Sequence, residues 1–289
     1  MQQTETRGIA ALLKDKITLP ASVEALSEAY KNAKPYPHVL MDNLFPEAML
    51  DALLAEIPSL NGSKWVEEND ARLVKYNLRS AVDLGETGYQ MAAFLNSAGF
   101  LYLLSEVTGI WNLLPDPYLQ GAGYHLIPRG GHFDIHADRN TAYETGLTRR
   151  LAMLVYLNKD WKHEYGGQLE LWSTDASRCE VVIEPKFNST ILFEITDQNF
   201  HGVPAVVNCP EGRARCSFVV YYHTAAVNDG RTTAHTSIYA PDIYQPKKSL
   251  FKRLAKEVTP PVVHRALHKW KTARGKARNG HAANGHGKA

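Results

Sequence analysis

Gly130-Gly131-His132-Phe133-Asp134-Ile135-His136-Ala137-Asp138 is the most informative stretch of the chain. It ends in His-x-Asp, and a single histidine lies far downstream in Phe200-His201-Gly202. Side chains at positions i and i+2 of a strand point to the same face, so His136 and Asp138 can converge on one ion. A third ligand must come from a distant strand, and His201 follows a strand-like segment. The sequence therefore predicts a metal site built from His136, Asp138 and His201.

His-x-Asp alone is a weak signal, because the chain has 12 histidines and His132-Phe133-Asp134 is a second, overlapping match. The complete ligand set is more specific. Two imidazoles and one carboxylate bind one face of a metal and leave the other face open, which is typical of non-haem Fe(II) oxygenases. The residues downstream of His201 then show whether the chain also has a group that could bind a co-substrate beside the metal.

Two arginines, Arg213 and Arg215, lie on or near the strand that comes after His201. Activation of O2 needs two electrons beyond those from the substrate, and a keto-acid co-substrate can supply them. The far carboxylate of that keto acid needs a cation, best a bidentate arginine. Arg215 is preferred because the hydroxyl of Ser217 lies two residues on, on the same strand face. Arg213 remains an alternative.

The apolar pattern changes from a helical to a strand period along the chain. Helical spacing predicts helices over residues 22–32, 46–57 and 86–107, with a strand at 38–42 between the first two. After residue 117 the pattern is one of short strands without βαβ alternation, which favours a sandwich or barrel over a parallel sheet. The expected strands are 118–127, a strand that carries His136 and Asp138 after a break at Gly130-Gly131, 151–157, 168–172, 179–183, 189–193 and 215–222, with a hairpin turn at Pro185–Asn188.

Several short motifs resemble the core of the hypoxia-sensing prolyl hydroxylases, which are Fe(II)/2-oxoglutarate dioxygenases, and more closely resemble bacterial relatives of that family. The resemblance covers about residues 35–225. It is carried by Thr108-Gly109-Ile110, Pro115-Asp116-Pro117, Gly130-Gly131, His136-x-Asp138, Tyr156-Leu157-Asn158-Lys159-Asp160-Trp161, Gly166-Gly167-x-Leu169-Glu170-Leu171-Trp172, Ile183-Glu184-Pro185-Lys186-Phe187, His201-Gly202, Pro210-Glu211-Gly212 and Arg215-x-Ser217.

The resemblance implies a fold that is mainly β with flanking α: a double-stranded β-helix, or jelly-roll, with N-terminal helices. It implies that the ligand is His136 and that His132 is a neighbour. It further implies that Tyr156 binds 2-oxoglutarate beside Arg215 and Ser217, and that Tyr124 and His125 face the cofactor. The expected cofactors are Fe(II) and 2-oxoglutarate. Ascorbate is an additional candidate, as a reductant.

The implied reaction is hydroxylation of an unactivated C–H bond with O2 and 2-oxoglutarate, with succinate and CO2 as co-products. The primary substrate is a prolyl residue in a protein, or a small metabolite, lipid-linked intermediate or saccharide. The alternative is a jelly-roll binding or scaffold protein that has lost turnover. Val203 and Arg139 depart from the bacterial pattern of His and Phe at these positions, and both flank the metal. Retention of Asp138 argues against a halogenase.

Composition divides the chain into parts. Residues 247–289 carry 12 Lys/Arg and one acid, which leaves a net charge of −9 on the rest of a chain whose total is +2. We expect a helical extension at 1–34, the oxygenase domain at 35–225, and an extension at 226–289 with basic amphipathic segments and a disordered end. A solvated charge run is the simpler interpretation of this tail. The alternative is a contact with a membrane surface or an anionic polymer, through Phe251, Leu254, Leu267 and Trp270.

Other features of the composition exclude function classes. The three cysteines lack Cys-x-x-Cys spacing, so neither a disulfide framework nor a structural zinc site is indicated. An odd, low cysteine count fits a reducing cytosol. We see no signal peptide and no apolar run of membrane-spanning length. The acidic body disfavours nucleic acid as a partner. The expected location is cytoplasmic, with peripheral membrane contact as an option through the tail.

Overall fold

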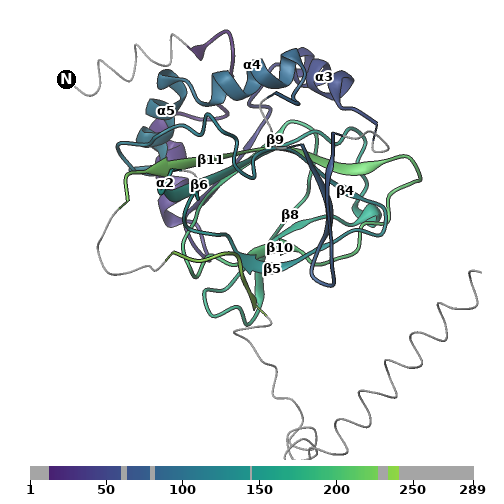
Figure 1. The fold of residues 1–289 in the computed structure, drawn as a ribbon. Helices are drawn as coiled ribbons and strands as arrows, with labels where there is room; N and C mark the ends of the chain where they lie inside the picture. The colour runs from purple at the N-terminus through teal and green to yellow at the C-terminus, as the bar shows by residue number, and fades with distance from the viewer. Residues whose placement is uncertain (1–12, 60–63, 79–81, 144, 227–233, 241–289) are drawn as a thin grey trace, which may run out of the picture. The chain divides into compact units, whose positions relative to one another are not determined.

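A computed structural model of the chain describes residues 13–59, 64–78, 82–143, 145–226 and 234–240 (Figure 1). The N-terminal part contains α2 (Val23–Asn32), β1 (His38–Asp42) and α3 (Glu47–Glu56), as predicted. The hydroxyl of Ser22 accepts a hydrogen bond from the amide of Ala25 at 3.2 Å and so caps α2. The expected basic segments beyond residue 246 lie outside the described residues.

The single helix expected over residues 86–107 is in fact two helices, α4 (Glu86–Leu95) and α5 (Ala98–Thr108). The reason is local. The side-chain amide of Asn96 donates to the Ala92 carbonyl at 2.9 Å, and the Ser97 hydroxyl accepts from the Phe100 amide and caps α5. Gly109, at φ 74°, ends α5 in the left-handed conformation, as predicted.

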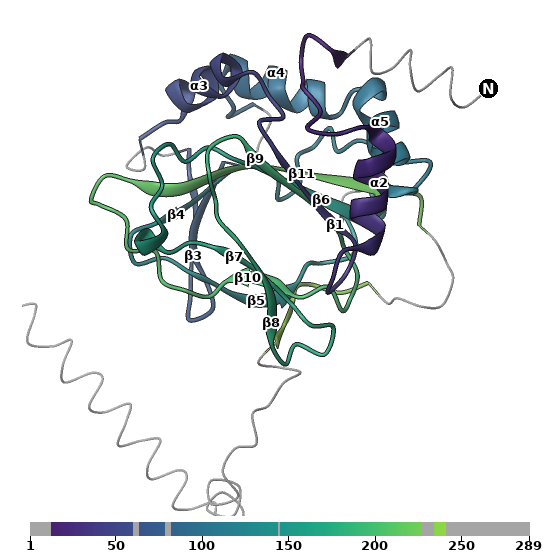
Figure 2. The same cartoon turned by 180° about the vertical axis from the view of Figure 1, so that it is seen from behind.

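Two antiparallel sheets make up the rest of the fold (Figures 1 and 2). The larger has the strand order β1-β9-β6-β11-β4-β3-β2, and the smaller has the order β12-β5-β10-β7-β8. The sheets face each other, and α2 to α5 lie on the outer side of the larger one. This is the predicted jelly-roll with N-terminal helices. The strands after β1 are β2 (Val66–Asn69), β3 (Val74–Leu78), β4 (Gly123–Pro128), β5 (Phe133–Ala137), β6 (Thr148–Tyr156), β7 (Leu169–Trp172), β8 (Cys179–Ile183), β9 (Ser189–Glu194), β10 (His201–Val203), β11 (Ala214–Thr224) and β12 (Ile238–Tyr239).

The predicted hairpin around Pro185–Asn188 is wrong. β8 pairs with β7 in the smaller sheet, whereas β9 pairs with β1 and β6 in the larger sheet. The connection therefore crosses from one sheet to the other. At its end Asn188, at φ 58°, forms two hydrogen bonds with the backbone of Phe45, to its N–H at 3.1 Å and to its carbonyl at 2.7 Å. A turn-like composition gives no sign of which sheet the next strand joins.

Other boundaries differ from the expectation. The strand predicted from Tyr118 begins only at Gly123, because Asp116 bonds the amides of Tyr118 and Gln120 and holds a turn there. β2, β3 and β12 were not predicted. His201 begins a strand and does not come after one, and Asp138 lies just beyond the end of β5.

The two faces of β11 contact different parts of the fold, the helices on one side and the space between the sheets on the other. Phe218 and Tyr222 face the helices: the Phe218 ring meets that of Tyr124, and the Tyr222 hydroxyl donates to the Leu95 carbonyl at 3.2 Å. The alternate residues Ser217, Val219 and Tyr221 line the space between the sheets. Since side chains alternate along a strand, each β11 residue belongs to one layer only.

Among the described residues, none of the helices has the length and apolar character that a membrane span requires.

Replacement of Asn188 tests the crossover between the sheets. Asn188→Ala leaves the buried Phe45 N–H and carbonyl without their partners, so we expect a loss of roughly 2 to 4 kcal/mol in the free energy of unfolding. Denaturant titration measures it. Asn188→Gly keeps the positive φ accessible and should lose a similar amount, whereas Asn69→Ala, at an exposed position, should change stability by less than about 0.5 kcal/mol. Equal stability of Asn188→Ala and Asn69→Ala would contradict the assignment.

Candidate metal centre and its cavity

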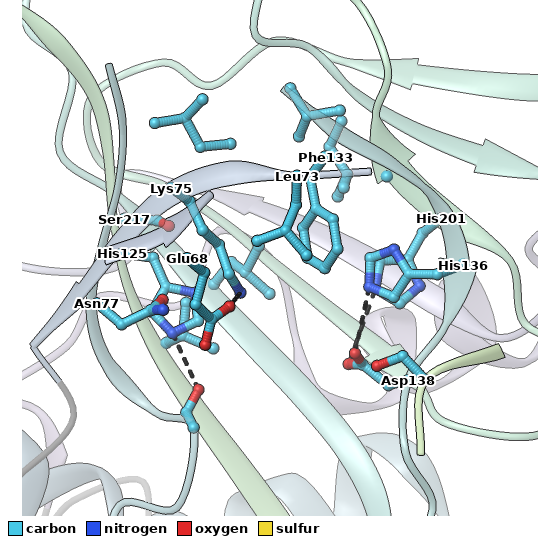
Figure 3. A pocket seen from close by; sticks show the side chains of 18 of the residues that line it. Glu68, Leu73, Lys75, Asn77, His125, Phe133, His136, Asp138, His201 and Ser217 are labelled. Atoms are coloured by element: carbon cyan, nitrogen blue, oxygen red, sulfur yellow. Dashed lines mark hydrogen bonds and ion pairs between the residues drawn. The ribbon is translucent and has the colours of Figure 1, made fainter. Parts of the chain in front are cut away.

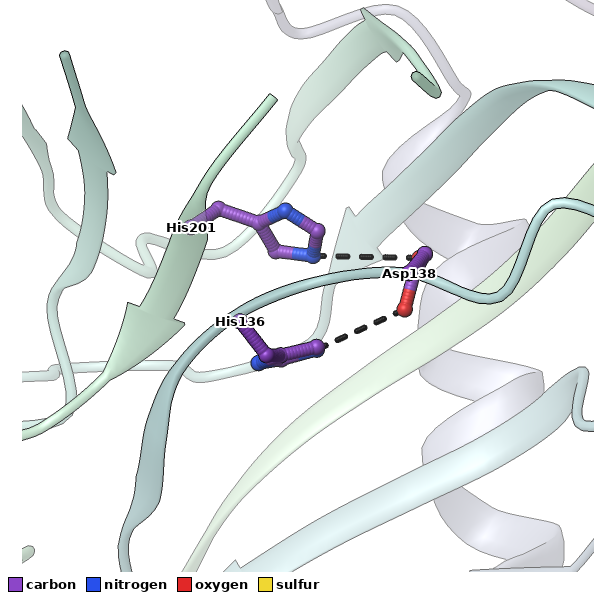
Figure 4. Close-up of side chains that lie close together, drawn as sticks. All are labelled: His136, Asp138 and His201. Atoms are coloured by element: carbon purple, nitrogen blue, oxygen red, sulfur yellow. Dashed lines mark ion pairs between the residues drawn. The ribbon is translucent and has the colours of Figure 1, made fainter. Parts of the chain in front are cut away.

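The three predicted ligands lie together (Figure 4). β10 pairs with β5 so that His201 stands directly opposite His136. Nε2 of His136 is 3.4 Å from one carboxylate oxygen of Asp138, and Nε2 of His201 is 3.7 Å from the other. One potential ligand atom from each residue lies within 4.8 Å of the others, and all three residues are buried. Two nitrogens and one oxygen converging in this way could hold a divalent metal.

Backbone carbonyls orient both imidazoles. Nδ1 of His136 is 2.8 Å from the Asp134 carbonyl, and Nδ1 of His201 is 3.2 Å from that of Asn199. A carbonyl can only accept, so each Nδ1 carries the hydrogen, and in the neutral form of each ring Nε2 has a free lone pair on the side of Asp138. Nε2 of His136 is buried and makes no hydrogen bond to any of the described residues. A metal ion would satisfy this atom.

The charge states suit metal binding. Burial acts to raise the pKa of Asp138, but its interaction with His136 and the nearby His201 outweigh burial and hold that pKa well below the ordinary range. Burial lowers the pKa of His201 to about 4, against the opposing effect of Asp138. At neutral pH the site therefore presents an ionised carboxylate and a neutral His201, the forms in which these side chains bind metals.

A cavity of about 310 Å³ opens between the two sheets beside these ligands (Figure 3). Arg215 lines it and is only 3% exposed. Its Nε donates to the Gly167 carbonyl at 2.7 Å, and its Nη2 donates to the Tyr156 hydroxyl at 3.3 Å. Burial lowers the pKa of Arg215, yet a guanidinium stays charged in proteins. Within the described residues Arg215 has no carboxylate partner, so it could bind an anionic ligand.

Two neighbours of Arg215 support this assignment. The Ser217 hydroxyl is buried with no hydrogen-bond partner and faces the cavity, as Figure 3 shows. Gly167 has φ +77°, and a Cβ there would lie 3.1 Å from Cδ of Arg215. The second glycine of the Gly166-Gly167 pair thus allows the backbone carbonyl to approach the guanidinium.

Arg213 lies outside the cavity. It donates to the Lys159 carbonyl, and its guanidinium lies 5.7 Å from the ring centroids of both Trp161 and Tyr165. Trp161 in turn donates its indole N–H to the Gly166 carbonyl at 2.9 Å. Arg213 therefore stabilises the loop that carries the glycine pair, and it does not reach the metal ligands.

The expectation for Tyr124 is wrong. Its ring packs between the sheet and the helices, and its hydroxyl is 3.3 Å from the Leu53 carbonyl in α3. The next residue, His125, lines the cavity instead, with Nε2 at 2.9 Å from the Gly121 carbonyl. One of two consecutive strand residues must face inward, and the local sequence does not say which.

Some cavity residues were not predicted. Phe133 stacks on the His136 ring with centroids 3.8 Å apart, and Nζ of Lys75 lies 4.5 Å from the Phe133 ring (Figure 3). Lys75 also pairs with Glu68 at 3.5 Å. Tyr239 of β12 approaches His136, with ring centroids 5.9 Å apart. The alternation in Val74-Lys75-Tyr76-Asn77-Leu78 could have revealed β3, but nothing local reveals β12.

The two departures from the bacterial pattern both line the cavity: Val203 is buried, and Arg139 lies beside Asp138. Arg149 lines it as well and is 3% exposed. Val203, Arg139 and Arg149 therefore contribute to the cavity in addition to the three predicted ligands and Arg215.

Comparison with known proteins agrees with this geometry. Residues 119–223 match the 2OG-Fe(II) oxygenase superfamily. The chain is 27% identical to the prolyl 3,4-dihydroxylase OGFOD1 of Ostreococcus tauri over 226 residues, which are 71% of this chain and 41% of that protein. It is 28% identical to the prolyl 3-hydroxylase OGFOD1 of Xenopus laevis over 109 residues, which are 36% of this chain and 21% of that protein. The chain therefore spans less than half the length of these relatives.

Among solved structures, a prolyl-4-hydroxylase of Pseudomonas putida has a TM-score of 0.52 with 17% identity, covering 71% of this chain and all of that one. At this level of identity the likeness supports the fold.

Loss of a ligand side chain should abolish tight metal binding. His201→Ala removes one of the three predicted ligands, so we expect the affinity for Zn(II) or Fe(II) to fall by more than about 100-fold, as measured by competition with a chelator. His132→Ala is the matched control, because His132 belongs to the overlapping His-x-Asp and is not one of the clustered ligands. Equal losses in the two variants would show that the triad is not the metal site.

Proposed function

We propose that this chain is a hydroxylase that uses Fe(II) and 2-oxoglutarate, because residues 119–223 match the 2OG-Fe(II) oxygenase superfamily. In the overall reaction a substrate C–H, O2 and 2-oxoglutarate give C–OH, succinate and CO2, so both atoms of O2 enter products. The observation that carries the proposal is the buried cluster of His136, Asp138 and His201 on the same cavity as the buried Arg215, which has no carboxylate partner among the described residues.

Each residue of the cavity has a proposed task. His136, Asp138 and His201 hold Fe(II), which when bound supplies the redox chemistry with 2-oxoglutarate. Arg215 binds the distal carboxylate of 2-oxoglutarate, and the Tyr156 and Ser217 hydroxyls bind beside it. The walls of the cavity exclude water from the reacting groups. Ser217 supports this arrangement because its buried hydroxyl has no hydrogen-bond partner in the part of the chain that the structure describes.

We propose a prolyl residue as the substrate group. The support is the resemblance to two proteins described as prolyl hydroxylases, both at 27–28% identity. A small metabolite or saccharide is the alternative from the sequence. Peptides that contain proline, tested for a mass increase of one oxygen that accompanies succinate release, distinguish a hydroxylase from a protein that only binds.

The cofactor site can be tested without a substrate. Anaerobic addition of Fe(II) and 2-oxoglutarate should give a weak visible charge-transfer band in the wild type. We expect His136→Ala to lose the band because a ligand is missing, and Arg215→Ala to need at least about tenfold more 2-oxoglutarate because a charge-assisted contact is lost.

Arg213→Ala is the matched control for this titration, because its guanidinium contacts Trp161 and Tyr165 outside the cavity. It should keep the band and the 2-oxoglutarate affinity. A folded wild-type protein without any band would favour the jelly-roll binding protein over the hydroxylase. A loss in Arg213→Ala with none in Arg215→Ala would exchange the roles of the two arginines.

The domain limits, the cytoplasmic location, the use of ascorbate and the role of the basic tail remain predictions. The tail places 12 Lys/Arg beside apolar residues such as Phe251 and Trp270, which favours an anionic surface. Co-sedimentation with vesicles that contain anionic lipid should then be strong for the full chain and at least about tenfold weaker for a chain that ends at Gln245. Equal binding by both chains would leave the solvated charge run as the interpretation.

A further inference from the structure

Two further arginines line the cavity at the end away from Arg215. Arg215 and Tyr221 both face the cavity from opposite ends of β11, and roughly 20 Å of strand separates them. The guanidinium of Arg149 lies 4.0 Å from the ring centroid of Tyr221, and its Nη2 donates to the Gln120 carbonyl. Arg139 lies next to the ligand Asp138, with its guanidinium 4.8 Å from the Tyr143 ring. Arg149 and Arg215 therefore serve different parts of the cavity.

The charge of Arg149 is incompletely balanced. Its Nε is buried without a hydrogen-bond partner, and within the described residues neither Arg139 nor Arg149 forms an ion pair with a carboxylate. Two carboxylates lie close enough to Arg149 to feel its charge. Burial raises the pKa of Asp116 overall while Arg149 acts to lower it, and Arg149 also contributes to lowering the pKa of Asp138. The carboxylate of Asp116 accepts hydrogen bonds from the amides of Tyr118 and Gln120. A buried guanidinium without a counter-ion is costly, and a bound anion removes that cost.

The other charges of the cavity are matched once the proposed cofactors are present. Asp138 and the two carboxylates of 2-oxoglutarate balance Fe(II) and Arg215, and Glu68 pairs with Lys75 at 3.5 Å. Arg139 and Arg149 remain in excess, and they do so in a domain whose residues outside the tail carry a net charge of −9. A positive surplus confined to the cavity of an acidic domain favours an anionic ligand there.

We propose that the primary substrate carries a carboxylate close to the carbon that is hydroxylated, and that Arg149, with Arg139, binds this carboxylate. The inference rests on the proposed function and specifies the substrate of the same site. The carboxylate belongs to an acidic side chain beside a prolyl residue, or to the α-carboxylate of free proline. A planar guanidinium suits either, because it can donate two parallel hydrogen bonds to one carboxylate.

The test compares probes that carry the carboxylate with amides in which that carboxylate is replaced. Calorimetry would measure binding to the full chain loaded with Zn(II), which has no redox chemistry, and 2-oxoglutarate. The probes are the blocked peptides Ac-Asp-Pro-Asp-NH2 and Ac-Asn-Pro-Asn-NH2, and free L-proline against L-prolinamide. The variants are Arg149→Gln, Arg139→Gln and Arg150→Gln. Arg150 is the matched control, because it is adjacent in β6 but pairs with Glu194 at 3.3 Å and does not line the cavity.

We expect a charged probe to bind the wild type roughly tenfold to hundredfold more tightly than its amide. Arg149→Gln should remove most of this preference, Arg139→Gln should reduce it, and Arg150→Gln should keep it. Preference for the acidic peptide identifies a side-chain carboxylate, and preference for free proline over prolinamide identifies an α-carboxylate. Either result supports the proposal.

Two results would overturn it. The first is equal binding of each charged probe and its amide by the wild type, including no measurable binding of any probe. The second is a loss of 2-oxoglutarate affinity in Arg149→Gln as large as that in Arg215→Ala, because Arg149 would then belong to the 2-oxoglutarate site. The charge-transfer band of the wild type separates these failures from a failure of the hydroxylase assignment, since it does not depend on Arg149.

Discussion

The close antiparallel pairing of β5 with β10 is the constraint on which the site depends. It places His201 opposite His136, although the two residues are far apart in the chain. The approach requires a glycine after His201: a Cβ on Gly202 would lie 2.9 Å from the carbonyl oxygens of both Phe133 and Asp134. The same Asp134 carbonyl accepts from Nδ1 of His136 and fixes the imidazole. The pairing of β5 with β10, the tautomer of His136 and the approach of His201 to His136 thus all depend on the backbone at Phe133 and Asp134.

Local rules are enough to predict some parts of the site from the sequence. The i, i+2 relation of His136 and Asp138 brings both side chains close to His201, and the hydroxyl of Ser217 lies beside Arg215 for the same reason. Prediction fails where the answer depends on a distant partner. The local sequence does not show whether Tyr124 or His125 faces the cavity. The packing of Tyr124 against the helix layer over β4 decides it. Arg149 and its neighbour in β6 pose the same ambiguity.

The fold separates two kinds of positive charge. Arg150 pairs with Glu194 at 3.3 Å, and Arg213 is partly exposed to solvent outside the cavity. Arg149 and Arg215 are nine-tenths buried on the cavity, and neither pairs with a carboxylate of the described residues. The second kind is destabilising in the absence of ligand. The two buried guanidinium groups therefore lower the stability of the ligand-free domain and make the cavity complementary to an anion, a combination that is common at binding sites.

The alternation along β11 has a consequence for how this domain can diversify. Phe218 and Tyr222 contact Tyr124 and the helix layer, whereas Val219 and Tyr221 line the cavity. Substitutions in the first set change folding, and those in the second change what the cavity accepts. Because the two sets lie on opposite faces of one strand, selectivity can drift during evolution, or be redesigned, with little effect on the scaffold.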